Sequence, residues 1–208
     1  MTTLLEDLDA AERTEREPPR SRAMRRLGGG LALAAVAMCL LGVFGGRWWT
    51  LEFGSGLVAV GLGESRFCDT RGEHCEALPE YEFVRYAASR SGGEAADAKR
   101  IQDWLDQRGP AQKALAAAMV AATILGVIAI APRRRDGVRV VAGVAGVAAV
   151  AALVLVFRFL GSTPFDLLTR GVHGYIACAG LVDLLLGAVL VAIPRGLPTL
   201  PTARVVTR

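Results

Sequence analysis

The sequence predicts an all-α membrane bundle of four transmembrane helices that carries a small extracytoplasmic antiparallel β-sheet and a short helix. Three observations lead to this fold class. Hydrophobic residues make up 52% of the 208 residues, above the roughly 45–50% of soluble domains. They gather in four separate apolar blocks, and arginines cluster on one side of those blocks. The longest polar interval, 47–112, contains strand and turn patterns.

Each apolar block is long enough for a helix to cross about 30 Å of hydrocarbon. We expect transmembrane helices at 27–46, 113–132, 140–160 and 174–194. A basic stretch precedes the first block, which is also a feature of cleaved signal peptides. The residues after it, "FGGRWW", make a poor cleavage site, so we expect the first helix to be retained.

The arginines indicate the orientation of the helices. They cluster before the first helix, in the turn between the second and third helices, and after the fourth helix. By the positive-inside rule, the tail 1–26, the turn 133–139 and the tail 195–208 are cytoplasmic. The segments 47–112 and 161–173 are then extracytoplasmic. The net charge of +4 is an orientation signal and does not indicate nucleic-acid binding. The Ala-, Gly- and Arg-rich composition suggests a bacterial cell membrane.

The long outer segment predicts a domain of its own. "WWTLEF" alternates as a half-buried strand does, "LVAVGL" follows a glycine-rich turn, and "SRFC" and "CEAL" form a hairpin. The stretch "AADAKRIQDWLDQR" places Ile101, Trp104, Leu105 and Arg108 on one helical stripe, and Gly109 with Pro110 is expected to end or bend that helix.

Cys68 and Cys75 lie in the predicted hairpin, on the oxidising side of the membrane. Disulfides persist in that compartment, so we expect the two cysteines to be joined. His74 with both thiolates is the metal-binding alternative, but the spacing fits no common zinc pattern. No metal or cofactor is predicted.

Trp48 and Trp49 directly follow the first apolar block, and two interpretations stay open for them. Indoles at headgroup depth form the aromatic belt of many membrane proteins. Alternatively, one of them packs under the sheet and anchors it to the bundle.

The pattern resembles the claudin / PMP22-like tetraspan family. The residues that carry the resemblance are Trp48 or Trp49, the pair Gly56-Leu57, and Cys68 with Cys75. The resemblance implies four helices, both termini inside, and a first outer loop that forms a small sheet with a disulfide. It also implies a short outer helix that leads into the second membrane helix.

Two charged residues stand near or in the predicted bundle. Asp183 is the one acid well inside a membrane segment, where carboxylates often mark ion or proton paths. Arg158 lies near the outer end of the third helix and is expected to snorkel outward. We favour a structural role for Asp183, with a functional one left open.

Small residues recur on the third and fourth apolar segments, where they let helix backbones approach closely. They are Ala142, Gly143, Gly146, Gly180 and Gly187. Their role is either packing within the bundle or docking to another membrane subunit. Cys39 and Cys178 are expected to behave as small apolar residues.

These observations favour a non-catalytic tetraspan protein, not an enzyme, that acts as a structural, adhesive or accessory subunit. Its partners are the lipid bilayer and other membrane subunits or a second copy, and segment 3–17 has an amphipathic pattern that suits a cytoplasmic partner. The alternatives are a thiol/quinone redox enzyme and a small transporter that uses Asp183.

Overall fold

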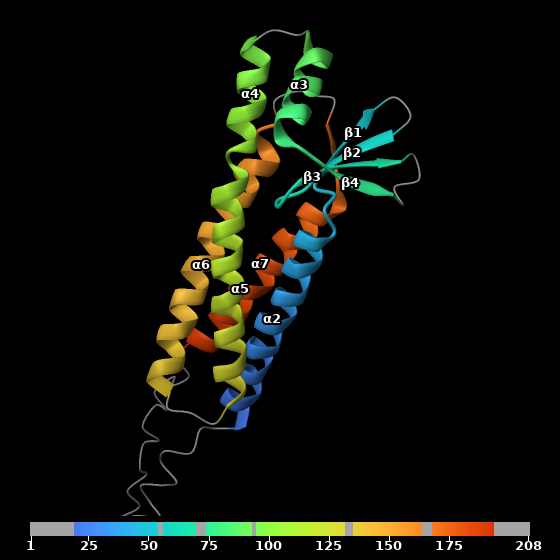
Figure 1. Ribbon diagram of the computed structural model, residues 1–208. Helices are drawn as coiled ribbons and strands as arrows, with labels where there is room; N and C mark the ends of the chain where they lie inside the picture. The colour runs from blue at the N-terminus through green and yellow to red at the C-terminus, as the bar shows by residue number, and fades with distance from the viewer. Residues whose placement is uncertain are drawn as a thin grey trace, which may run out of the picture.

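The computed structural model describes residues 19–53, 56–69, 74–92, 95–131, 135–163 and 168–193. Within these ranges the chain is mostly helical, with four long apolar helices and one small antiparallel sheet (Figure 1). All four helices are long and apolar enough to cross a membrane. The predicted combination of a four-helix bundle with a small sheet is therefore confirmed.

The four long helices lie side by side as a bundle (Figure 1). They are α2 (Pro19–Phe44), α5 (Arg108–Ile130), α6 (Arg135–Gly161) and α7 (Val172–Ala192). α2 begins earlier than the predicted residue 27, because arginine and methionine are good helix formers and a proline is tolerated in a first helical turn. The predicted partner segment 3–17 and the tail 195–208 lie outside the described residues.

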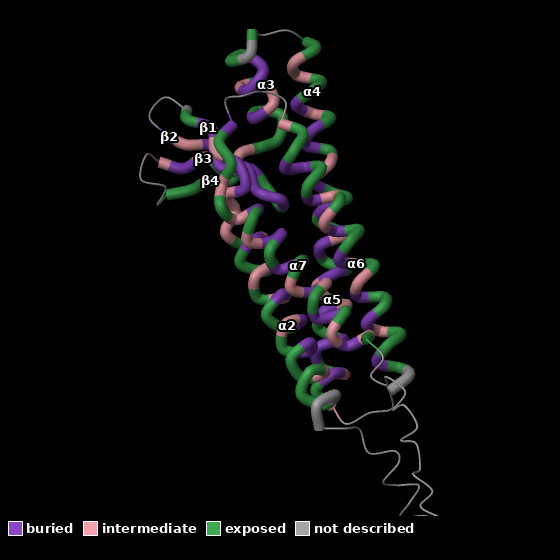
Figure 2. The backbone as a smooth tube through the Cα atoms, turned by 180° about the vertical axis from the view of Figure 1, so that it is seen from behind, coloured by how far each residue is buried: buried purple, intermediate pink, exposed green. Residues whose placement is uncertain are grey.

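The buried side chains of the bundle follow a repeat of three and four residues. In α5 they are Ala111, Leu115, Ala118, Ala122, Leu125 and Ala129, and in α6 they are Val138, Ala142, Ala145, Ala149, Ala152, Val156 and Phe159. This spacing is that of left-handed helix packing. The outward faces carry exposed Val, Leu and Ile side chains, so buried and exposed stretches alternate along each helix (Figure 2). Helices that are apolar all round fit hydrocarbon surroundings.

α2 and α7 make the most extensive helix contact of the bundle, and glycines make it possible. A Cβ added to Gly28 would lie 2.7 Å from the carbonyl oxygen of Gly187, and a Cβ added to Gly187 would lie 2.6 Å from that of Gly28. A Cβ on Gly180 would lie 2.9 Å from the carbonyl oxygen of Ala35. Gly180 and Gly187 therefore pack inside the chain, in the α2–α7 seam.

The sheet has five antiparallel strands in the order β4-β3-β2-β1-β5. The strands are β1 (Trp49–Phe53), β2 (Gly56–Val60), β3 (Ser65–Asp69), β4 (Cys75–Leu78) and β5 (Thr169–Arg170). The first four are the predicted ones. β5 belongs to the second connecting loop, 161–173, where no strand was predicted because two residues carry no alternation signal. It joins the sheet through β1.

Two helices follow the sheet, α3 (Glu80–Ser91) and α4 (Ala95–Leu105), where one was predicted. α3 has a sequence signal: Phe83 and Ala87, one helical turn apart, are fully buried, and two acids occupy its first turn, where the helix dipole favours them. The predicted stop at Gly109 and Pro110 is wrong. The break comes earlier, between Leu105 and Arg108, and the proline lies in the first turn of α5, where it is tolerated.

The sheet, α3 and α4 together form what we call the head. The head lies at one end of the bundle, and the start of α2, the end of α5 and the start of α6 lie at the other (Figure 1). The described core is continuous from the bundle into the head, because buried residues of α2, α5, α6 and α7 belong to the same cluster as those of β1, β2, α3 and α4.

Replacing Gly28 with Ala tests the α2–α7 seam. The new methyl group meets the backbone of α7, so we expect Gly28→Ala to destabilise the chain by about 1–3 kcal/mol, as overpacking does. A Cβ on Gly30, in the same helix, meets nothing within 4 Å. Gly30→Ala is therefore the matched control and should keep or raise the midpoint of thermal unfolding in detergent. Equal midpoints for the two variants would contradict a seam that requires glycine.

Candidate functional site

Four aromatic side chains join the head to the bundle, and we call them the aromatic cluster: Trp48, Trp49, Trp104 and Phe159. Trp104 of α4 stacks on Phe159 of α6, with ring centroids 5.0 Å apart and planes 13° apart. Trp49 of β1 meets Trp104 edge-on at 6.3 Å, and Trp48 lies 6.1 Å from Phe159. Such offset and edge-on geometries are the favourable ones for aromatic pairs.

Two of the indoles also bind backbone at the ends of bundle helices. Trp48 Nε1 donates to the carbonyl oxygen of Gly42, at 2.7 Å, and Trp104 Nε1 donates to that of Phe159, at 3.1 Å. Both carbonyls belong to the last turn of a helix, where no intrahelical donor is left for them. Each bond therefore satisfies two groups that burial would otherwise leave unpaired.

The structure places both Trp48 and Trp49 in the core, at 0% and 1% exposure. An aromatic belt requires indoles that reach the headgroup layer, so the belt interpretation fits neither residue. Instead, Trp48 packs against Phe159 of α6, and Trp49 packs against Trp104 of α4. Trp49 carries the guanidinium of Arg170, from β5, over its ring at 5.6 Å, which ties the second connecting loop to the same point.

A polar contact links α3 and α4 to the start of α5. Glu80, the first residue of α3, accepts a hydrogen bond from Gln102 of α4 at 2.7 Å. Its other oxygen lies 3.6 Å from Nη2 of Arg108 in α5. Arg108 is only 7% exposed, and a buried guanidinium needs a carboxylate nearby. Sequence reasoning placed Arg108 on the packed stripe of its helix but missed Glu80.

Cys68 and Cys75 form a disulfide, as predicted. They face each other on the neighbouring strands β3 and β4, with Cys68 buried and Cys75 exposed. A cross-link over so short a loop stabilises by about 2–3 kcal/mol on the chain-entropy model. His74 is exposed. Within the described ranges, no three His, Cys, Asp or Glu side chains gather where they would hold a metal ion.

The structure does not bring Asp183 and Arg158 together. Asp183 is partly buried on α7, and Arg158 is exposed in the last turn of α6. Among the described residues, no ion pair joins them. Cys39 donates to the carbonyl oxygen of Ala177 at 3.8 Å, so its thiol lies in the α2–α7 seam.

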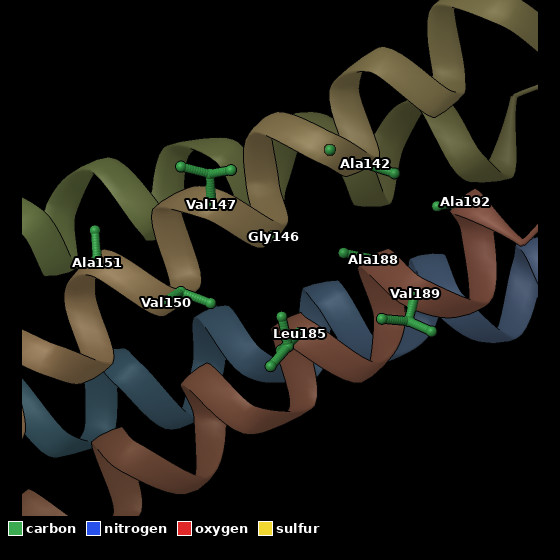
Figure 3. A pocket seen from close by; sticks show the side chains of 10 residues that line it. Ala142, Gly146, Val147, Val150, Ala151, Leu185, Ala188, Val189 and Ala192 are labelled. Atoms are coloured by element: carbon green, nitrogen blue, oxygen red, sulfur yellow. The ribbon is translucent and has the colours of Figure 1, made fainter.

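A groove of about 520 Å³ runs between α6 and α7 (Figure 3). Its wall on α6 is Ala142, Gly143, Gly146, Val147, Val150 and Ala151, and its wall on α7 is Leu185, Ala188, Val189 and Ala192. Every lining side chain is apolar. A Cβ on Gly143 would meet nothing within 4 Å, and the nearest atom to a Cβ on Gly146, in Ala188, would be 3.8 Å away.

The small residues thus divide into two groups. Gly180 and Gly187 are required by contact with α2, whereas nothing within the described chain requires glycine at 143 or 146. Small residues recur on both α6 and α7 in the sequence. Only the positions of the neighbouring helices show which of these residues are packed and which line the groove. The groove is the candidate binding site of the bundle.

No protein-family model matches this chain, and a search of curated proteins finds no significant match. The function proposed below therefore rests on the geometry of the head and of the α6–α7 groove.

Removing the central ring tests whether the aromatic cluster holds the head. Trp104→Ala leaves a large cavity and an unpaired carbonyl, so we expect a loss of about 3–5 kcal/mol. Hydrogen exchange followed by mass spectrometry should show faster exchange in β1, β2 and α4 while α2 and α7 stay protected. Tyr81→Ala, at a side chain that is 70% exposed, is the control and should change neither. Unchanged protection of the sheet in Trp104→Ala would show that other contacts hold the head.

Proposed function

We propose that this chain is a non-catalytic tetraspan membrane protein that acts as a structural or accessory subunit, and that it binds a membrane helix of its partner in the α6–α7 groove. The observation that carries the proposal is the groove itself. It is an apolar hollow about 520 Å³ in volume, and two of its lining residues, Gly143 and Gly146, are glycines that no contact within the described chain requires.

The chemistry of the groove suits a helix of another subunit. Between helices in lipid, association comes from close van der Waals packing, which small residues permit. The α6 wall extends from Ala142 to Ala151, about 14 Å at 1.5 Å per residue, or two to three turns of a docked helix. Exposed valines on both rims, Val147 and Val189, would fit between the side chains of that helix.

The head is proposed to be extracytoplasmic and the termini cytoplasmic, in a bacterial cell membrane. The arginines at the start of α2 and α6 support this, because both helices start at the end of the bundle opposite the head (Figure 1) and cytoplasmic loops are rich in Lys and Arg. The Cys68–Cys75 disulfide supports it independently, since disulfides persist in oxidising compartments.

We also propose membership of the claudin / PMP22-like tetraspan group. What supports it is the arrangement around the sheet: a tryptophan opens β1, a disulfide joins β3 to β4, and a short helix leads into the next long helix. A structural or adhesive role for the head agrees with the edge strand β4, in which Cys75, Glu76 and Ala77 are exposed.

Thiol labelling tests the orientation. In a chain with Cys39→Ala and Cys178→Ala, a cysteine is added at Tyr81 in the head or at Gly137 near the start of α6; both positions are exposed. A membrane-impermeant maleimide should label Tyr81→Cys on intact cells and Gly137→Cys only after permeabilisation. The reverse pattern would place the head in the cytoplasm.

Photo-crosslinking tests the groove. A photoreactive phenylalanine analogue at Val147, 72% exposed on the groove rim, should capture one discrete partner polypeptide in native membranes. The same analogue at Val127, 58% exposed on α5, is the control and should capture none. Gly143→Leu, whose Cβ would meet nothing within 4 Å, adds a bulky side chain to the groove wall and should abolish the product. Identical products from both positions, or a product that survives Gly143→Leu, would refute docking in the groove.

A further inference from the structure

We propose that a cleft between the sheet and the end of α2 binds the headgroup phosphate of an anionic phospholipid through Arg47 and Arg66. The cleft consists of two adjoining cavities of about 370 Å³ and 280 Å³. Arg66 and Gly46 line both of them, Arg47 lines the first, and Val43 and Phe44 line the second. The inference rests on the proposed membrane location but not on the docking of a partner.

The two faces of the sheet differ in the size of their side chains, and the cleft lies on the face with the smaller ones. On one face, Trp49, Leu51, Val58 and Val60 are buried in the core. On the other face Arg66 is flanked by alanines, with Ala59 opposite it on β2 and Ala77 opposite it on β4. Small neighbours leave room around the guanidinium, where bulky ones would fill the cavity.

Glycines form much of the remaining wall. Gly46, at φ 67°, makes the turn that follows α2, and Gly61 and Gly63 form the connection between β2 and β3. A Cβ on Gly63 would meet nothing within 4 Å. At Gly63 the wall is therefore backbone with open space beside it, where a ligand can approach the chain closely, whereas Gly61 packs against the backbone of Gly46.

The charges of the cleft favour an anion. Arg47 and Arg66 carry two positive charges, and Glu64 carries one negative charge and forms a salt bridge with Arg66. The Arg66 side chain remains 49% exposed. A guanidinium has five N–H donors, so pairing with one carboxylate leaves donors for a phosphate. Arginine is also the side chain whose planar fork matches phosphate oxygens in pairs.

The apolar side of the cleft indicates a lipid as the source of that phosphate. Val43 and Phe44 are the last two residues of an apolar helix, so the cleft begins where the hydrocarbon layer ends. Phe44 is 79% exposed and Leu41, one turn below, is 63% exposed. Acyl chains can lie along this face of α2 while the phosphate enters the cleft. A free phosphate would use the arginines but not the two exposed side chains.

Native mass spectrometry of the full chain, delipidated in detergent, tests the proposal. Dioleoylphosphatidylglycerol should bind as one tight adduct, with an affinity on the order of tenfold above that of dioleoylphosphatidylcholine. The double variant Arg47→Gln/Arg66→Gln should lower the affinity for phosphatidylglycerol by about tenfold. Arg100→Gln, at an exposed arginine of α4 in a surface ion pair of 3.8 Å, is the matched control and should leave the affinity unchanged.

Gly63→Phe provides a test that keeps both arginines. The ring fills open space in the cleft and should reduce phosphatidylglycerol binding while the midpoint of thermal unfolding stays that of the natural chain. Equal binding of the two lipids, or full binding by the double arginine variant, would overturn the proposal. Displacement of the lipid by inorganic phosphate at an equal concentration would overturn the assignment to a lipid, since it would show that the acyl chains contribute nothing.

Discussion

The stacking of Trp104 on Phe159 is the contact on which the rest of the arrangement depends. These two rings come from the head and from the bundle, and their centroids are 5.0 Å apart. Trp48 and Trp49 pack against them from the start of the sheet. A small sheet with one apolar face is marginal by itself, and it becomes stable here because that face shares one core with the bundle. The hydrogen bonds of Trp48 and Trp104 to helix-end carbonyls fix where each indole lies, so the head has a defined orientation on the helices.

A second constraint acts in the bundle. Some small-residue surfaces of the helices are buried by close contact with a neighbouring helix, and others are left uncovered. Gly28, Gly180 and Gly187 pack in the α2–α7 seam, where there is no room for a side chain. α6 packs against both α5 and α7, and its alanines are buried, whereas the glycine positions 143 and 146 line the groove beside α7. Glycine thus lets α2 and α7 approach each other closely. Between α6 and α7, Gly143 and Gly146 instead leave a groove. The proposed partner helix and the proposed lipid occupy two different hollows of this kind, one along the bundle and one beneath the sheet.

The sequence predicts much of this fold because several signals are local. Apolar length predicts the four long helices, and alternation with turn residues predicts β1 to β4. The disulfide follows from two cysteines in one hairpin. α3 was missed although Phe83 and Ala87 mark its buried side, because twelve residues with mixed charges give a weak periodic signal. β5 and the role of Phe159 could not be predicted. Each depends on which distant segment lies beside it, and nothing in the local sequence encodes that neighbour.

The central claim is that the aromatic cluster holds head and bundle as one rigid body. Pulsed electron–electron double resonance measures the distance between head and bundle directly. Spin labels are placed at the exposed positions Tyr81 in α3 and Val147 in α6, with the chain in lipid nanodiscs. The account predicts a single narrow distance distribution. This distribution should stay the same when samples are frozen from increasing temperatures below the unfolding transition. A broad or bimodal distribution would show that the head moves freely on the bundle and would contradict the account.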